Sequence, residues 1–183
     1  KTDLEGFIKT GFNISKIDQQ DKKIKLFFEN DEEKECDYLI ISDGVFSKSR
    51  SLMSKDAAKP KYNNTLAIRG ILNKSPENID SKNIALFLGS DFHHVFYPVS
   101  PNGDLNFIAI MKYPLSVEEQ KNYSLFSDNL FIKKVLEKFP LRNKSFLDDL
   151  KELKIFPVFV SENFYKLQND NIHFIGDAFF AFP

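Results

Sequence analysis

The run CDYLIISDGVFSKSR, residues 36–50, decides the fold. Its continuous apolar centre predicts a strand over residues 36–42 that is covered on both faces, as in a parallel sheet between helices. This strand leads directly into Asp43-Gly44, and the apolar spacing after the glycine predicts a helix over residues 45–53. A strand, an acidic turn and a helix in this order predict an α/β arrangement.

A similar pattern, an apolar run followed by a turn with Gly and Asp, recurs at residues 172–183, IHFIGDAFFAFP, where the turn is Gly176-Asp177. An Asp at such a turn can cap a helix by accepting from backbone N–H groups, and Gly permits unusual dihedral angles. Alternatively, both turns lie where α/β proteins bind ligands, beyond the carboxyl ends of strands. An Asp there can accept the hydroxyl protons of a ribose or ribitol. The residues alone leave both interpretations open.

The composition limits the class of partner. The chain has 183 residues, 42% of them hydrophobic, which is enough for a core. With 25 basic and 26 acidic residues, we expect neither nucleic acid nor an anionic membrane as partner, but a small molecule. Cys36 stands alone, and no apolar stretch approaches the roughly 20 residues of a membrane helix. We therefore expect a cytoplasmic protein without a transmembrane segment.

Further elements follow from hydrophobic periodicity and turn residues. The expected β elements are a hairpin over 12–18 and 23–29, a mainly antiparallel block over 62–112 with a turn at 101–103, and strands over 155–160 and 172–175. The acidic stretch 30–35 is expected to be an exposed turn. Ser116 and Glu119 have capping-box spacing, which predicts a helix over 116–138 that Pro140 stops, and a second helix is expected over 145–153.

The two acidic turns resemble the flavin motifs of the aromatic-ring flavoprotein monooxygenases, the p-hydroxybenzoate hydroxylase-like family. The residues that match the first motif are Asp43, Gly44, Ser47 and Arg50, and those that match the second are Gly176, Asp177, Ala178 and Pro183. The chain departs from the family at Ile41-Ser42, where a small pair is usual, and at Phe180, where His is common. The glycine-rich nucleotide turn of the family is absent, so we expect an internal fragment of a longer flavoenzyme.

The resemblance implies an α/β (α+β) fold with two parts. Residues 1–60 would belong to a Rossmann-like FAD-binding domain, residues 61–160 would form a mainly antiparallel substrate-binding sheet with helices, and residues 161–183 would return to the FAD-binding domain. The resemblance also implies that Asp177 contacts the ribityl part of FAD and that a helix follows it.

The activity implied by the resemblance is that of an FAD-dependent monooxygenase. NADH or NADPH would reduce the flavin, O₂ would form a C4a-hydroperoxide, and one oxygen atom would pass to an aromatic or similar ring substrate. The cofactor-binding residues would be Asp43, Gly44, Arg50, Gly176, Asp177, Ala178 and Pro183. No catalytic residue can be assigned. A flavoprotein halogenase, an isoprenoid reductase and a non-catalytic binding or interaction domain stay open as alternatives, as does a homodimer.

Candidate substrate contacts lie in the β block: Arg69, His94 and Tyr97. Arg69 stands in an apolar strand, where a charge needs a ligand, a salt bridge or an exposed edge position. His93 and His94 are adjacent, so they point to opposite faces and at most one can face the flavin. Neither His pairs with a second cluster of potential metal ligands at the spacing that metal sites need, so no metal site is expected.

Two residues of the first motif have other interpretations. Arg50 could be a surface cation or could pair with Asp43, and Ser47 is expected to be a hydroxyl on the helix face rather than a ligand.

Overall fold

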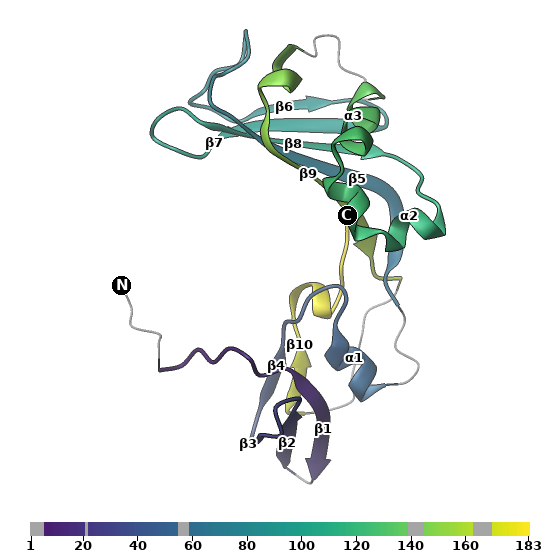
Figure 1. Ribbon diagram of the computed structural model, residues 1–183. Helices are drawn as coiled ribbons and strands as arrows, with labels where there is room; N and C mark the ends of the chain where they lie inside the picture. Colours follow the sequence, from purple (N-terminus) through teal and green to yellow (C-terminus); the bar gives the residue numbers. More distant parts are fainter. Residues whose placement is uncertain (1–5, 21, 55–58, 139–144, 163–169) are drawn as a thin grey trace. The chain divides into compact units, whose positions relative to one another are not determined.

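The computed structural model describes residues 6–20, 22–54, 59–138, 145–162 and 170–183 (Figure 1). The chain divides into two compact units, one formed by residues 1–61 and 159–183 and the other by residues 62–158. The sheets are mainly antiparallel and are accompanied by short helices, which confirms the expected mixed α/β class. The assignment of FAD to the first unit and of substrate to the second stays a prediction.

The first unit begins with the expected hairpin, which is confirmed. Strand β1 (Ile14–Gln20) pairs antiparallel with β2 (Lys23–Phe28), and β3 (Glu33–Cys36) pairs antiparallel with β2. Successive side chains of β2 point to opposite faces of the sheet. Ile24 and Leu26 are therefore buried, at 0% and 8% exposure, while the lysines of this strand lie at the surface. The exposed turn is shorter than expected, since β3 already begins at Glu33.

A two-stranded parallel sheet completes this unit. Strand β4 (Leu39–Ile41) pairs with β10 (Ile172–Phe174), with Leu39 opposite Ile172 and Ile41 opposite Phe174. Both strands bury alternate residues in one apolar cluster with β2. The buried members of this cluster are Ile24, Leu26, Ile41, Ile172, Phe174 and Ala178.

The expected strand over residues 36–42, covered on both faces, is wrong in this structure. Cys36 ends the pairing of β3 with β2, and Leu39 begins the pairing of β4 with β10, so the chain changes sheets between them. Tyr38 and Ile40 are 70% and 64% exposed. A one-sided strand buries only alternate residues, which is why Ile41 is in the core and Ile40 is not.

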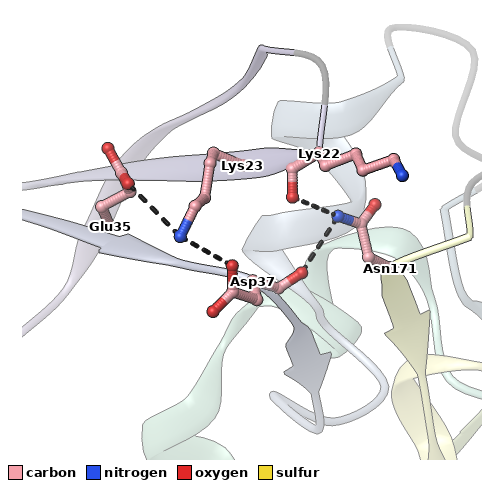
Figure 2. Close-up of polar contacts among 5 residues, drawn as sticks. All are labelled: Lys22, Lys23, Glu35, Asp37 and Asn171. Carbon is pink, nitrogen blue, oxygen red and sulfur yellow. Dashed lines mark hydrogen bonds and ion pairs between the residues drawn. The ribbon is translucent and has the colours of Figure 1, made fainter.

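Asn171 connects the start of β10 to the hairpin (Figure 2). Its side-chain Nδ2 donates to the backbone carbonyl oxygens of Lys22 and Asp37, each at 3.0 Å. Its backbone carbonyl oxygen accepts from the Leu39 N–H at 2.9 Å. Figure 2 also shows the Lys23 side chain between Asp37 and Glu35. Its Nζ lies 2.7 Å from the Asp37 carboxylate and 3.7 Å from that of Glu35. The Asn171 contacts tie the start of β10 to the hairpin and to the start of β4.

The second unit contains a five-stranded sheet in the order β6-β7-β8-β5-β9. Its strands are β5 (Lys61–Leu72), β6 (Ala85–Leu88), β7 (Phe92–Pro98), β8 (Leu105–Lys112) and β9 (Lys151–Val160). The pairs β6-β7, β7-β8 and β8-β5 are antiparallel, and the expected turn between β7 and β8 is confirmed. In that turn Gly103 has a φ of 90° and its N–H donates to Ser100 O at 3.2 Å.

Strand register gives this sheet two faces. We call one the covered face: it carries Ile68, Phe96, Phe107 and Ala109, all at most 1% exposed. Phe146 packs edge-on against Phe96 and Phe107, with ring centroids 5.3 Å apart in both pairs. We call the opposite side the open face, and its residues include Arg69, Tyr97, Asn106 and Ile108.

The helical region is more broken than the sequence predicts. The capping box of Ser116 and Glu119 is confirmed, but the single helix over 116–138 is wrong. The helices here are α2 (Val117–Lys121), the 3₁₀ segment η1 (Tyr123–Ser127) and α3 (Asn129–Glu137). Asp128 starts α3 anew by accepting from Phe131 N–H at 2.8 Å, since Asp side chains favour caps over helix interiors. Pro140 lies outside the described residues.

The expected helix over 145–153 is also shorter than predicted. Residues Ser145–Asp149 form the 3₁₀ segment η2, and β9 begins at Lys151. Two further helical elements are described, the helix α1 (Lys48–Met53) and the 3₁₀ turn η3 (Gly176–Ala178). Helix α1 begins three residues later than the sequence predicts and ends at the predicted residue.

Candidate functional site

The Asp43-Gly44 turn follows the carboxyl end of β4 and starts α1. Gly44 has a φ of 81°, a conformation that favours glycine, and nothing lies within 4 Å of the Cβ another residue would add. The Oδ2 atom of Asp43 accepts from the Ser49 N–H at 3.0 Å, and the Oγ of Ser47 accepts from the Arg50 N–H at 3.1 Å. Two backbone donors of the first helical turn are thereby satisfied.

Asp43 is exposed, and its ionised form is stabilised. Burial, the largest single influence, raises the pKa of its carboxyl group, but hydrogen bonds from Ser47 and Ser49 together outweigh burial and hold this pKa below its ordinary value. Asp43 is therefore an anion at neutral pH, with one oxygen engaged by the backbone of α1.

Arg50 and Ser47 are buried at the start of α1 and do not lie at the surface. Arg50 is only 5% exposed and its guanidinium donates to the carbonyl of Val45, so it is not a surface cation. Within the described residues, Arg50 takes part in no salt bridge, and the expected alternative of a pair with Asp43 is not seen. Ser47 is the N-cap of α1, not a hydroxyl on its face.

The Gly176-Asp177 turn follows the carboxyl end of β10. The Ile175 N–H donates to Ile41 O at 2.9 Å, which extends the contact with β4 up to the turn. Gly176 has a φ of 57°, and its carbonyl accepts from the N–H groups of Phe179 and Phe180. Ala178 is fully buried in the core of this unit. The helix implied after Asp177 is a single 3₁₀ turn here.

The carboxylate of Asp177 is exposed and, in the part of the chain that the structure describes, accepts no hydrogen bond and forms no ion pair. The segment beyond it is fixed by Ser161, whose N–H donates to Ala181 O at 2.8 Å and whose Oγ accepts from the Ala181 N–H at 3.0 Å. Pro183 is exposed at the end of this segment.

The structure brings the two turns to the same edge. Because β4 and β10 are parallel and in register, Asp43 lies two residues beyond one strand end and Asp177 three residues beyond the other. Both belong to the first unit. In open α/β sheets, ligands bind beyond the carboxyl ends of the strands, and both carboxylates lie at such an edge.

In the second unit the three candidate residues do not share a face. Arg69 and Tyr97 lie on the open face, whereas His94 lies on the covered face at 5% exposure. The His94 ring stacks on Phe87 with a centroid distance of 4.6 Å and an interplanar angle of 4°. Burial, followed by the nearby His93, lowers the pKa of His94, which favours a neutral imidazole.

Asn106 is a candidate site residue that the sequence did not predict. It is fully buried between Ile71 and Tyr97 in the strand register, and its Oδ1 accepts from Arg69 Nε at 3.2 Å. Its Nδ2 has no hydrogen-bond partner among the described residues. The signal in the sequence was an amide within the apolar run LNFIAIM, residues 105–111.

Arg69 does not fit either structural alternative that its sequence context offered. Strand β5 lies between β8 and β9, so the position is not on a sheet edge, and among the described residues Arg69 forms no salt bridge. It is exposed and donates to Asn106. Arg69 therefore stays a candidate for substrate contact on the open face.

The described residues contain no group of three or more His, Cys, Asp or Glu side chains that could hold a metal ion. None of the helices in the described part of the chain is long and apolar enough to cross a membrane.

Comparison with known proteins gives one curated relative and many solved structures. Salicylate hydroxylase of Pseudomonas putida is 28% identical over 121 residues, which cover 58% of this chain and 28% of that protein. No protein-family model matches the chain. The chain thus spans less than a third of the curated relative.

Three solved structures illustrate the likeness. HpxO of Klebsiella pneumoniae complexed with FAD and uric acid has a TM-score of 0.64 at 17% identity, covering 93% of this chain and 43% of that one. A salicylate hydroxylase substrate complex has a TM-score of 0.68 at 20% identity, covering 93% and 46%. The 2,6-dihydroxypyridine-3-hydroxylase of Arthrobacter nicotinovorans has a TM-score of 0.66 at 15% identity, covering 96% and 52%.

The fold is therefore that of part of the FAD-dependent aromatic hydroxylases. The resemblance indicated by the two acidic turns is confirmed by the curated relative and by the solved structures.

Proposed function

We propose that this chain is part of an FAD-dependent monooxygenase that hydroxylates an aromatic or similar ring compound. The observation that carries the proposal is the placement of Asp43-Gly44 and Gly176-Asp177 at the ends of two paired parallel strands. The salicylate hydroxylase relative and the FAD complex of HpxO support FAD as the cofactor.

The residues at this edge suit the cofactor. Gly44 and Gly176 leave open space where a side chain would stand, and Asp177 presents an exposed carboxylate that no described residue engages. We assign to Asp177 the acceptance of hydroxyl protons from the ribityl chain of FAD. Asp43 and Arg50 would act through α1, because Asp43 accepts from its first turn and Arg50 binds the helix to the preceding turn at Val45.

When bound, FAD would supply the redox chemistry, taking a hydride from NADH or NADPH and passing one atom of O₂ to the substrate ring. The protein must then orient the ring and exclude water. We assign orientation to the open face of the sheet, where the exposed guanidinium of Arg69 lies beside the buried Nδ2 of Asn106. The Arg69 guanidinium offers donors for a carboxylate, carbonyl or phenolate oxygen on the ring, and Asn106 would position it by accepting from its Nε.

The test is made on the full-length protein. After purification it should carry flavin absorbance, or gain it with added FAD, and should oxidise NADH or NADPH with matching O₂ consumption when a phenolic acid such as salicylate is supplied. Saturation of a substrate double bond without O₂ uptake would identify a reductase instead. A protein that stays colourless with FAD would exclude a flavoprotein, and the proposal would be withdrawn.

A further inference from the structure

The covered face of the second unit holds a cavity of about 720 Å³. It lies between the hairpin of β6 and β7, the segment 74–79 and η2. Cavities that bind small molecules span roughly 300–1,000 Å³. The cavity is on the opposite side of the sheet from Arg69 and Tyr97, so it is distinct from the substrate face proposed above.

The apolar wall of this cavity is aromatic and flat. Phe87, which is 42% exposed, stacks in parallel on His94, and Phe96 meets Phe146 edge-on behind them. Because burial lowers the pKa of His94, the imidazole adds a neutral ring rather than a charge. Ring faces of this kind pack best against another flat ring, through offset stacking or edge contacts.

The turn between β6 and β7 holds a further ring of the lining, that of Phe92. Gly89 donates its N–H to Phe92 O at 2.8 Å, and the Phe92 ring lies directly over it. A Cβ at Gly89 would stand 2.2 Å from Cε1 of Phe92, so only glycine lets that ring lie where it lines the cavity. The position of the Phe92 ring in the cavity lining thus depends on glycine at position 89.

Among the described residues that line the cavity, carboxylates outnumber ammonium groups. Glu77 and Asp149 contribute carboxylates, and Lys74 contributes the ammonium group. Carboxylates accept hydrogen bonds from hydroxyl groups and repel an anion. We propose that this cavity binds a planar, uncharged aromatic molecule bearing a hydroxyl group, with its ring on Phe87 and its hydroxyl toward Asp149. The inference is independent of the reaction proposed above.

The first experiment measures 2-naphthol binding to the full-length protein by calorimetry. Phe87→Ala removes the stacking surface and should weaken binding at this site about tenfold, the loss expected for part of one aromatic contact. Leu86→Ala is the matched control: it lies next to Phe87 on the same strand, is 56% exposed and faces the other side of the sheet. It should leave binding unchanged. Absence of binding, or equal losses in both variants, would overturn the proposal.

The second experiment locates the ligand and does not depend on any variant folding. Crystals of the full-length protein soaked with 6-bromo-2-naphthol should show the anomalous bromine signal within the cavity beside Phe87. Anionic 2-naphthoate should occupy the same position less well, because Glu77 and Asp149 repel its carboxylate. A bromine signal found only on the open face, or a cavity filled by another segment of the protein, would contradict the proposal.

Discussion

The turns at Asp43-Gly44 and Gly176-Asp177 use the same residue pair at the same edge of one parallel sheet, yet their carboxylates differ. Asp43 accepts from the backbone of α1, whereas Asp177 is exposed and, among the described residues, unengaged. A carboxylate that already holds a helix start contributes to the scaffold, and one that holds nothing is available to a ligand. This difference supports our proposal that Asp43 has a supporting role and that Asp177 contacts FAD directly.

The largest expected effect is on cofactor affinity. Asp177→Ala should raise the Kd for FAD about 30-fold, roughly 2 kcal/mol for a lost hydrogen bond to a charged group, with little change in Tm. Flavin fluorescence quenching measures the Kd. Asp170→Asn, which removes the same charge before the amino end of β10, should leave the Kd unchanged. Equal effects of the two substitutions would mean that only net charge matters.

The two glycines should respond alike, because both have positive φ angles with open space around them. Gly44→Ala and Gly176→Ala are each expected to lower the free energy of unfolding by about 1–2 kcal/mol, measured by urea denaturation. Gly6→Ala, which has open space without a positive φ, serves as control and should be nearly neutral. Neutral substitutions at either turn would show that its backbone is not held in this conformation.

Asp43 should affect stability more than binding. Asp43→Ala removes the acceptor for the Ser49 N–H and should cost about 1 kcal/mol of unfolding free energy, the usual loss for a helix cap. Asp43→Asn keeps a carbonyl acceptor and should recover most of that loss. If Asp43→Ala instead weakened FAD binding as strongly as Asp177→Ala without destabilising the protein, the distinction between the turns would fail.

The smallest expected effect is the contribution of Asp43 to the pH dependence of the free energy of unfolding. Its folded-state pKa is lowered from 3.8, so its contribution is complete above that unfolded value and is lost as the pH falls through the folded pKa. Unfolding measured between pH 5 and about pH 2.5 should show an acid-dependent decrease that is smaller in Asp43→Asn. The same decrease in both proteins would mean that other carboxyl groups account for it.

The sequence predicted those elements whose signals are local. The hairpin of β1 and β2, the turn at Gly103 and the Ser116 capping box follow from alternation and side-chain chemistry over a few residues. The same is true of the two acidic turns, whose glycines have the positive φ angles that such turns require.

What the sequence could not predict depends on contacts between distant segments. Ile40 is exposed because the chain changes sheet partner after Cys36, and periodicity carries no information about that change. Alternation showed that His93 and His94 point to opposite faces, but only the packing of Phe146 shows which face is covered. Asn106 became a site residue only when register placed it beside Arg69.

The most direct measurement is a crystal structure of the full-length protein with FAD bound. We expect the Asp177 carboxylate to accept a hydrogen bond from a ribityl hydroxyl at about 2.7 Å, while Asp43 keeps its bond to the Ser49 N–H. FAD bound with its ribityl chain away from Asp177, or held by Asp43 after loss of the helix cap, would contradict it.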